Sequence, residues 1–447
     1  MKLTSNSLVS ISNANNLRMG LSYAKESHAE FLGRFSSHCV ERIKDAFYVD
    51  NGTSITEAET EIGEIPVVAG GKDLAYFHNV SNRPAGCITI SASGANSGYV
   101  NYWATPIWAS DCITLKSKNE EHYSTKFLYH LLHIIQDDIY LLQKGSDQPH
   151  VYGNDIKYLK LPPIRIEQQK SVLLEIETLE KEIRAVQSEL KTEGSIIDSF
   201  FASEFGWAYD EFYAERSKKN FQVKLADFFS NVDLRFSAKF HRDAGIFVMN
   251  ELKKTTSKKI KHYLAEPIVL GASVTPTDYD DEGTHRYISM ATIKNWNFDP
   301  ESANVVSDVY AAAKGGKTVR QSDIILARSG EGTIGKVAII KEEVKAIFAD
   351  FTMRIRLKNY NPEFAYYYFR TTYFQYLIEI YKKGLGNNTN IFPIAIREFP
   401  MIDISLDEQQ RIVNKIHSEI NKQFVYQTKI TRLRQQIDDL VEKIIAQ

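Results

Sequence analysis

Two short segments of the chain combine amide, imidazole and lysine side chains, which are typical of surfaces that bind polar ligands. The first is KGSDQPHVYGN at 144–154, with the candidate residues Lys144, Ser146, Gln148, His150 and Tyr152. The second is KKGLGNNTN at 382–390, with the candidates Lys383, Asn387, Asn388 and Asn390. Amide side chains pair with adenine edges through two hydrogen bonds, and lysine binds phosphate or guanine. Both segments therefore favour contact with nucleic acid, although either alone is also typical of a solvated turn.

A glycine-rich segment, GEGTIGKV at 330–337, has the spacing of a phosphate-binding loop but lacks its context. A P-loop needs a following helix and a serine or threonine after its lysine, whereas Val337 and a strand-like run follow Lys336. A kinase loop is excluded by order, because His241-Arg242-Asp243 precedes the glycines. We interpret the segment as a hairpin turn. Basic residues around it are further candidates for binding DNA, namely Arg320, Arg328 and Lys336.

The rest of the chain has no set of residues with the spacing of a catalytic or metal site. The 11 histidines are scattered, without an H-x-E or HExxH pair to hold a metal. The segment Asn361-Pro362-Glu363-Phe364 has glutamate where a methyltransferase tetrad needs a second proline. The acidic residues within 278–282 lie in a turn-rich segment, which indicates a solvated surface. We therefore predict no catalytic residue and no metal ligand in this chain.

Both polar segments recur at equivalent places in a long internal repeat. ISASGANSG at 90–98 matches LARSGEGTIG at 326–335, and an EQQ triplet starts at both Glu167 and Glu408. Matching residues lie 236 to 241 positions apart, a drift that loop insertions in a duplicated unit would produce. Ala92 and Tyr99 stand at the places of Arg328 and Lys336, so we expect the two halves to contact different bases.

Each half is predicted to be a strand-rich domain followed by a long helix. Short aromatic and β-branched runs, cut by Gly, Asn and Pro, predict domains at 1–165 and 217–404. Within each domain one helix is predicted, near 124–143 and at 362–382, and each ends at a Lys-Gly pair. The fold class is then α+β, with two similar domains related by a pseudo-two-fold repeat.

The helical segments at 166–216, which includes a linker, and at 405–447 carry the heptad spacing of a coiled coil. A capping box of Ser405 and Glu408 is predicted to begin the second. We expect the two helices to pair in antiparallel fashion, with Gln423 and Gln427 solvated or given polar partners. The predicted seams are Val172, Ile176, Leu179, Ile183, Val186 and Leu190 in the first helix, and Ile430, Leu433, Ile437, Leu440 and Ile444 in the second.

Composition narrows the class of protein further. A chain of 447 residues suits two domains with extensions, and a net charge of −2 means that any basic surface must be local. The three cysteines, Cys39, Cys87 and Cys112, form no CxxC pair and fit a reducing compartment. Neither a signal peptide nor a membrane span is evident, so we expect a cytoplasmic protein.

The chain combines the paired glycine hairpins, the Gly-Asn loops, and the segments PPIRIEQQ and LDEQQRIV that open long helices. In these features it resembles the specificity (S) subunits of type I restriction-modification systems. The resemblance covers essentially the whole chain. It implies bacterial phage defence, with two target-recognition domains that each read one half of a split, asymmetric site in double-stranded DNA. It also implies that the long helices separate these domains like a ruler and bind two methyltransferase (M) subunits, which restriction (R) subunits would join. Candidate M contacts are Phe200, Phe201 and Phe205.

The same resemblance implies that this chain has no cofactor, and that S-adenosylmethionine, ATP and magnesium belong to the partner subunits. Two departures from a regular repeat stand out. Leu17-Arg18 matches Leu234-Arg235 at an offset of only 217, and the first Pro-Pro pair is reduced to PMIDIS at 400–405.

Three alternatives stay open. The first is that the chain is a specificity subunit of another DNA-methylating defence system, such as a type IIB-like or phage-exclusion complex. The second is that it is a coiled-coil scaffold that binds proteins. The third is an enzyme that uses ATP at GEGTIGKV.

Overall fold

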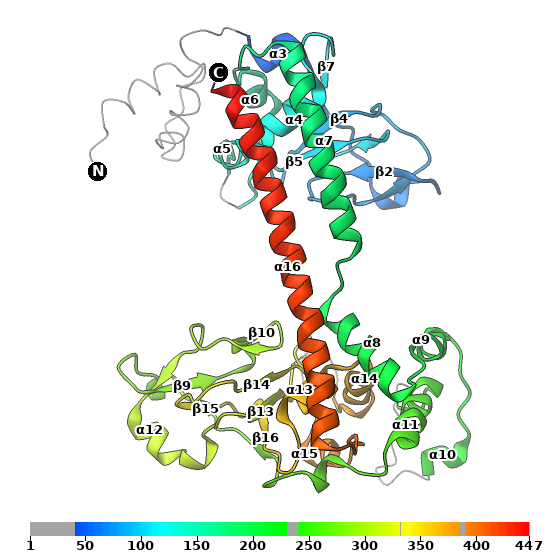
Figure 1. Ribbon diagram of the computed structural model, residues 1–447, viewed down its shortest axis with the longest axis vertical. Helices are drawn as coiled ribbons and strands as arrows, with labels where there is room; N and C mark the ends of the chain where they lie inside the picture. The colour runs from blue at the N-terminus through cyan, green and yellow to red at the C-terminus, as the bar shows by residue number, and fades with distance from the viewer. Residues whose placement is uncertain (1–40, 146, 230–239, 331, 385–388, 447) are drawn as a thin grey trace. The chain divides into compact units, whose positions relative to one another are not determined.

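The protein, described by a computed structural model over residues 41–145, 147–229, 240–330, 332–384 and 389–446, forms two compact units. Unit 1 comprises Met1–Glu189 and Tyr426–Gln447, and unit 2 comprises Leu190–Val425. Each unit combines sheets with helices, which confirms the predicted α+β class (Figure 1). No helix within the described ranges is long and apolar enough to cross a membrane.

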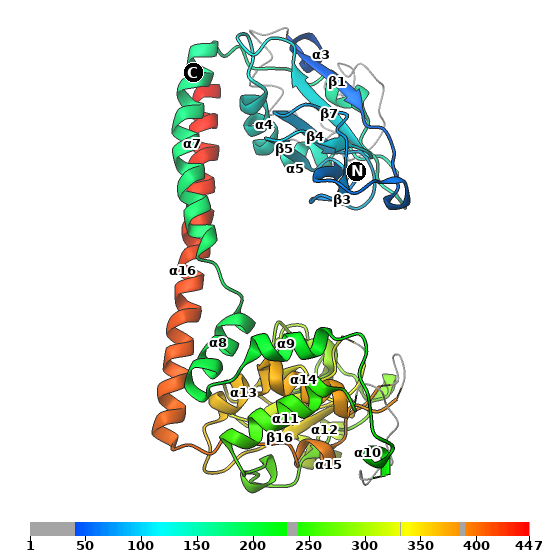
Figure 2. The ribbon, with the colours of Figure 1, turned by 90° about the vertical axis from the view of Figure 1, so that its right-hand side faces the viewer.

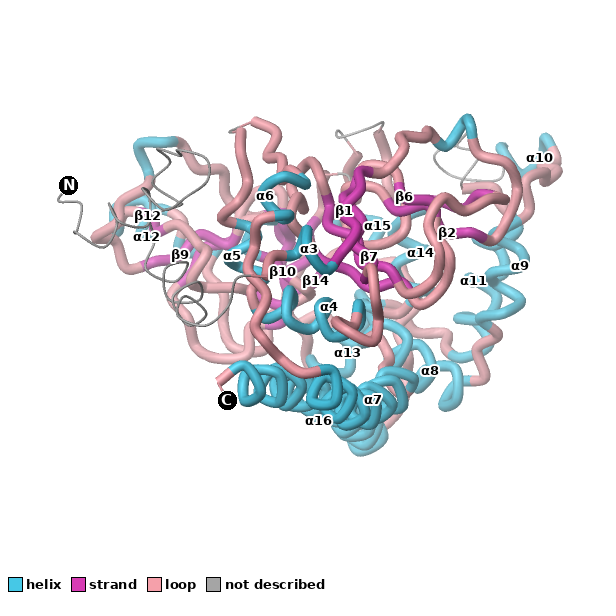
Figure 3. The backbone as a smooth tube through the Cα atoms, turned by 90° about the horizontal axis from the view of Figure 1, so that it is seen from above, coloured by secondary structure: helices cyan, strands magenta, loops and turns pink. Residues whose placement is uncertain are grey.

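Unit 1 contains a four-stranded antiparallel sheet with the order β1-β7-β4-β5 and a three-stranded sheet with the order β3-β2-β6, in which β2 and β6 are parallel. Figure 3 shows α4 between the strands of the larger sheet and α7, both of which it contacts. The strands are β1 (Phe47–Asn51), β2 (Ile65–Val68), β3 (Tyr76–His78), β4 (Cys87–Ser91), β5 (Val100–Trp103), β6 (Trp108–Ala109) and β7 (Cys112–Ser117). The helices are α3 (Ile43–Ala46), α4 (Thr125–Ile134), α5 (Gln136–Tyr140), α6 (Gly153–Lys157) and α7 (Ile166–Ser188).

Unit 2 repeats this topology strand for strand. Its larger sheet has the order β8-β16-β13-β14 with every pair antiparallel, and its smaller sheet has the order β12-β9-β15 with β9 and β15 parallel. The main strands are β8 (Val269–Leu270), β9 (His285–Ile288), β12 (Val305–Val306), β13 (Ile324–Ala327), β14 (Val337–Ile339), β15 (Ala346–Phe348) and β16 (Thr352–Ile355). The helices include α8 (Glu193–Phe205), α9 (Tyr209–Ser217), α10 (Leu225–Phe229), α11 (Asp243–Thr255), α13 (Pro362–Arg370), α14 (Thr372–Tyr381) and α15 (Pro393–Ile396). The duplication predicted from the sequence is therefore present in the order and direction of the strands.

The larger rise in offset along the repeat, from 217 to 240, comes mainly from two insertions in unit 2. Arg42 bridges Lys160 in unit 1 and Lys259 bridges Pro400 in unit 2, so the offset rises from 217 to 240 between these points. The added elements are a hairpin of β10 (Ile293–Lys294) and β11 (Asn297–Phe298), and helix α12 (Asp308–Ala313). The offset of 217 suggested by Leu17-Arg18 and Leu234-Arg235 thus holds at Arg42, although both dipeptides lie outside the described residues.

Each helix that the sequence predicted within a domain is in fact two helices. The segment 124–143 forms α4 and α5, separated at Ile135, and 362–382 forms α13 and α14, separated at Thr371. Thr371 has the extended backbone angles of a helix cap, and its hydroxyl accepts the Phe374 N–H. The Asp198 carboxylate accepts the Thr372 N–H at 2.8 Å. A side chain distant in sequence therefore supports the break, and helical periodicity alone does not show it.

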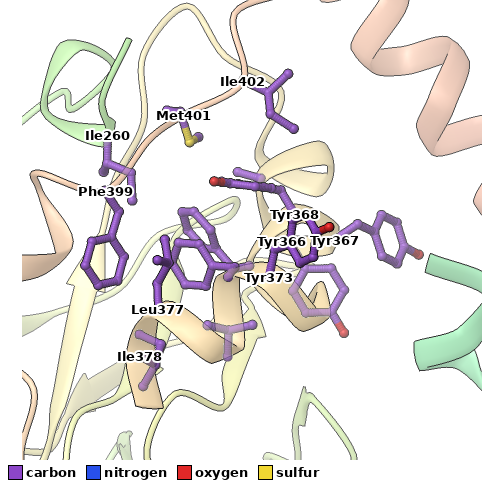
Figure 4. Close-up of a cluster of buried hydrophobic side chains, with 14 of the residues drawn as sticks. Ile260, Tyr366, Tyr367, Tyr368, Tyr373, Leu377, Ile378, Phe399, Met401 and Ile402 are labelled. Carbon is purple, nitrogen blue, oxygen red and sulfur yellow. The ribbon is translucent and has the colours of Figure 1, made fainter. Parts of the chain in front are cut away.

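The core of unit 2 is largely aromatic and lies between its helices and the larger sheet (Figure 4). Tyr368 and Tyr373 are fully buried. The Tyr368 hydroxyl donates to the Pro400 carbonyl at 2.7 Å, which gives this buried polar group a partner. Met401 and Ile402, in the segment that leads into the last helix, pack into the same cluster.

The segment 190–216, predicted to belong to the central coiled-coil helix and linker, packs into unit 2 as α8 and α9. Phe201, Trp207 and Phe212 are buried in its core, and Phe200 and Phe205 pack partly buried against it. Phe201 is therefore not available to bind another subunit, contrary to the expectation from the sequence. Burial of three large aromatic side chains explains why this segment joins the domain instead of extending α7.

In unit 1, α7 pairs with the end of α16 (Leu406–Ile445) in antiparallel fashion (Figures 1 and 2). Glu182 Oε1 lies 2.7 Å from Lys429 Nζ, and earlier residues of α7 line a groove with later residues of α16. The buried seam positions are Val172, Ile176, Ile183, Ile430, Leu433, Ile437 and also Val441, which we had not included. Four others are partly exposed, namely Leu179, Val186, Leu440 and Ile444, while Leu190 follows the end of α7.

Helices α7 and α8 together match α16 at a constant offset of 240, but only α16 is continuous. The first pair is interrupted between Ser188 and Glu193. At this break the Lys191 N–H donates to Gln423 Oε1 at 2.8 Å, and the Gln423 side chain is buried. Gln423 was predicted to be either solvated or paired with a polar group, and it is paired. The Lys191 N–H has no intrahelical partner at the break, which explains why a glutamine occupies this seam position.

One glutamine of each EQQ triplet joins a long helix to its domain, namely the last residue of the first triplet and the middle residue of the second. Gln169 and Gln409 are 0% and 1% exposed. Gln169 Oε1 accepts the Ser124 N–H at 2.9 Å and its Nε2 donates to the Ile164 carbonyl at 2.8 Å. Gln409 does the same with the Asn361 N–H at 2.8 Å and the Ile404 carbonyl at 2.9 Å. Ser124 and Asn361 are the N-caps of α4 and α13, so one amide fixes the start of two helices.

We predict that Gln409→Met, which keeps the side-chain length but removes both hydrogen bonds, destabilises unit 2 by about 2 to 4 kcal/mol, since each buried group left unpaired costs about 1 to 3 kcal/mol. Gln410→Met is the matched control, because the Gln410 side chain is exposed and its loss should cost under about 0.5 kcal/mol. Urea denaturation measures both values. Equal destabilisation by the two variants would contradict a specific role for the buried amide.

A second prediction concerns Glu204 of α8, which accepts hydrogen bonds from Arg411 at 2.6 Å and Lys415 at 2.8 Å on α16. These bonds lower the pKa of Glu204 from 4.5 to about 2. Because the folded-state pKa is depressed, the stabilisation is complete above pH 4.5 and is lost as the pH falls toward 2. Glu204→Gln should therefore lower the melting temperature at neutral pH and progressively less in acid. A difference that does not change with pH would count against this ion pair.

Candidate nucleic-acid interface

The two polar segments fold onto the same place in each unit, beside the glycine hairpin. In unit 1, His150 bridges both Ser93 and Lys144, and in unit 2, Asn390 bridges both Ser329 and Lys383. The backbones of Lys144 and His150 exchange two hydrogen bonds of 2.8 Å, and those of Lys383 and Asn390 exchange two of 2.7 Å. These hydrogen bonds use main-chain atoms, so they are kept in both units although the side chains differ.

A glycine and a glutamine shape each loop. Gly145 and Gly384, which follow the lysines, have φ values of +96° and +103°, a conformation that favours glycine. Gln136 Nε2 donates to the Gly98 carbonyl at 2.8 Å, and Gln375 Nε2 donates to the Gly335 carbonyl at 2.9 Å. These two glutamines hold the hairpin turns against the following helices. Sequence analysis missed them, although their matching positions in the repeat were a usable signal.

In unit 1 the candidates Lys144, His150 and Tyr152 come together. Lys144 Nζ lies 3.0 Å from the buried Asp155 carboxylate and 5.0 Å from the centre of the Tyr152 ring. The His150 and Tyr152 rings are stacked with their centres 6.2 Å apart. Gln148 is exposed in the same loop, and Ser146 lies outside the described residues. The arrangement presents an amide, an imidazole, a phenol and a cation whose charge Asp155 partly balances.

In unit 2, Arg328 lies beside the second loop. Its Nε donates to the Asp350 carbonyl at 2.9 Å, and its guanidinium carbon is 5.7 Å from the centre of the Phe392 ring. Lys383 is exposed in the loop, and Lys336 is partly exposed just before β14. Asn387 and Asn388 lie outside the described residues. The hairpin of unit 2 is thus more basic than that of unit 1, where Ala92 and Tyr99 take the places of Arg328 and Lys336.

Arg320 is separate from this group. It precedes β13 while Arg328 follows it, and a four-residue strand rising about 3.3 Å per residue separates the two. The Arg320 N–H donates to the Asp323 carboxylate at 2.8 Å, so its backbone belongs to the turn at the far end of the strand. Its exposed side chain contributes charge to a different part of the surface.

The glycine segment is a β hairpin, because β13 and β14 pair in antiparallel fashion across it. No helix follows Lys336, so the structure lacks the helix N-terminus that a P-loop directs at phosphate. Across the described ranges no group of three or more His, Cys, Asp or Glu side chains is placed to hold a metal ion.

Two of the titratable groups with strongly shifted pKa values, His130 and Cys112, are buried. Burial lowers the pKa of His130 in α4 to about 3, and the nearby Lys126 adds to the effect, so the imidazole is neutral although Glu180 lies 3.6 Å away. Burial raises the pKa of the Cys112 thiol to about 12. Cys112 and Cys87 are buried free thiols, and Cys39 lies outside the described residues. Neither shifted group is exposed where a ligand would meet the loops.

Comparison with known proteins gives a family match and structural alignments to solved chains. The profile of the family described as "Type I restriction modification DNA specificity domain" matches residues 39–192 and 270–435. The S subunit of a type I restriction-modification system from M. genitalium is 14% identical and aligns over 90% of this chain and 95% of that chain, with a TM-score of 0.48. A chain from a structure on complex assembly and conformational transition of the type I R-M system is 13% identical, covers 91% and 96%, and has a TM-score of 0.49. No curated protein sequence matches the chain.

Proposed function

Because the chain belongs to the family of type I restriction-modification DNA specificity domains, we propose that it reads a bipartite, asymmetric site in double-stranded DNA for a methylating complex. The observation that carries this proposal is the repeated framework of loop and hairpin. Two copies of one backbone arrangement support two binding sites of similar geometry. A ligand with two related, separated halves fits such a pair, and a split DNA sequence is a ligand of that kind.

The side chains on the two frameworks support different half-sites. His150 in unit 1 corresponds to Asn390 in unit 2, and Ala92 in unit 1 corresponds to Arg328 in unit 2. An asparagine amide pairs with adenine and an arginine pairs with guanine, whereas alanine contacts only apolar groups such as the thymine methyl. The two units therefore favour different bases.

Catalysis is proposed to belong to the partner subunits. Specificity subunits supply recognition, and the described residues here contain no metal-binding group that would support hydrolysis. S-adenosylmethionine, ATP and magnesium would then be bound by methyltransferase and restriction subunits. This chain contributes the position of the DNA relative to those enzymes.

We propose that the paired helices bind two methyltransferase subunits, one for each unit.

 In unit 1, a groove of about 500 Å³ runs between α7 and the end of α16, and Leu179 and Leu440 line it with polar neighbours. Leu174 on α7 is exposed nearby in sequence. Exposed apolar side chains on a charged helix pair are typical of a surface that another protein covers. Phe201, which is buried, is no longer a candidate for this contact.

The division of labour between the units is tested by His150→Ala in unit 1 and Asn390→Ala in unit 2, with Gln148, Asn387 and Asn388 as further loop variants. Loss of a base contact costs about 1 to 3 kcal/mol, or roughly ten-fold or more in affinity, and should be confined to one half of the DNA site. Lys144→Ala and Lys383→Ala should instead weaken all sites alike and reduce the salt dependence. The assay is binding of the assembled complex to half-site variants at two salt concentrations. A complex that binds no DNA at all would favour the protein-scaffold alternative.

We also propose that the helical segments shared by the two units set the number of unread base pairs between the half-sites. Seven residues added within α7 after Gln187 and seven added within α16 after Val425 lengthen these helices by roughly 10 Å at about 1.5 Å per residue. The unread spacer should then grow by about three base pairs, at about 3.4 Å each. Mapping of methylated adenines in cells that carry the whole system measures the spacer. An unchanged spacer would refute the ruler.

A further inference from the structure

Tyr152 and Phe392 occupy the same position in the two units and are both large, exposed aromatic rings. They are 240 residues apart, and each directly precedes a short helix, α6 or α15. The residue before each ring makes an equivalent main-chain hydrogen bond to the hairpin. In unit 1 the Val151 N–H donates to the Ala92 carbonyl at 3.0 Å, and in unit 2 the Ile391 N–H donates to the Arg328 carbonyl at 2.9 Å. Tyr152 is 50% exposed and Phe392 is 41% exposed. Both rings therefore stand at the surface beside the candidate loops.

Each ring has a cation over its face, but the two cations come from different elements. Lys144 Nζ lies 5.0 Å from the centre of the Tyr152 ring, and Lys144 belongs to the loop. Arg328 lies 5.7 Å from the Phe392 ring, and Arg328 follows β13 in the hairpin. The residue of unit 1 that matches Arg328 is Ala92, which has no charge. Both units thus pair an exposed ring with a cation. The cation is supplied by the loop in unit 1 and by the hairpin in unit 2.

This combination suits a nucleic-acid ligand better than an interior packing role. An exposed cation–π contact contributes only about 0.5 to 1 kcal/mol, too little to explain two half-exposed rings as stabilising features alone. In double-stranded DNA a flat apolar ring contacts base edges such as the thymine methyl, and a cation held beside it reaches phosphate or guanine. The ring and the cation together therefore offer one surface for a base and one charge for the backbone next to it.

We propose that Tyr152 and Phe392 are the base-contacting anchors of the two half-sites, and that Lys144 and Arg328 are the cations that accompany them on the DNA. This assignment rests on the proposed function and adds to it a specific pair of residues in each unit. Phe392 is the clearer case, because phenylalanine has no hydroxyl group and its exposure has no hydrogen-bonding explanation.

The test uses the complex assembled with its methyltransferase subunits and DNA that carries the methylated site. Phe392→Ala should weaken binding by about ten-fold or more, as loss of one base contact in a duplex site does. Phe392→Tyr keeps the ring and should bind within about two-fold of the parent, on the same basis. Phe392→Leu keeps apolar bulk without the ring and should bind like the alanine variant. The matched control is Ile394→Ala, on the same helix and 73% exposed, which should leave binding unchanged.

Salt dependence separates the ring from its cation. Arg328→Ala should reduce the slope of affinity against salt by about one counterion, whereas Phe392→Ala should lower affinity without changing the slope. In unit 1, Tyr152→Ala should behave like Phe392→Ala, and Tyr152→Phe like the parent. Melting temperatures of the variants show whether each still folds, and the Leu and Tyr substitutions preserve packing if alanine does not.

The outcomes distinguish this assignment from the function on which it rests. If Asn390→Ala weakens binding but Phe392→Ala and Phe392→Leu do not, the anchor assignment is wrong and the DNA-reading function stands. If Phe392→Leu binds as tightly as the parent while Phe392→Ala is weakened, the ring serves packing and the assignment again fails. If the parent complex binds no DNA, both proposals fail together.

Discussion

The rest of each unit depends on one buried amide. Gln169 and Gln409 each use a side-chain oxygen to accept the N–H of a helix cap and a side-chain nitrogen to donate to a carbonyl five residues earlier. A buried backbone group without a partner is costly. If the long helix rotated or slid against its domain, one backbone N–H and one backbone carbonyl would both lose their hydrogen-bond partner. Glutamate at this position would lack the N–H donor, and leucine would lack both the donor and the acceptor. The direction in which each helix leaves its domain follows from this contact.

The loops show the complementary principle, in which the backbone is fixed and the side chains vary. The exchange of two main-chain hydrogen bonds at Lys144 and His150 is repeated at Lys383 and Asn390, with different residues at half of the positions. Because main-chain hydrogen bonds make the part of the framework that both loops share, substitutions at His150 or Asn390 alter what is bound while those bonds remain. Such a site can change its ligand more easily than a site whose binding residues also form the core.

The sequence predicts features that depend on spacing and fails for those that depend on contacts between distant residues. The internal repeat, the capping box at Ser405 and the antiparallel helices follow from spacing and are present in the structure. The break at Thr371 does not, because Asp198 helps to fix it from another helix. Phe392 was also missed, since a single phenylalanine before Pro393 is more typical of a core position. The candidate loops were located, but the cation over each ring comes from a pairing that only the folded chain reveals.

The division of the chain between its units has a consequence for folding during synthesis. Unit 1 takes its final helical segment from residues after Val425, whereas unit 2 is continuous from Leu190 to that point. Chains emerge from the ribosome at about 5 to 20 residues per second, N-terminus first. The seam of α7, with Val172, Ile176 and Ile183, therefore stays without its partner until the second domain has been made. The domain synthesised first is the last to be completed, and its apolar helix face is open to chaperones and to other nascent chains during that interval.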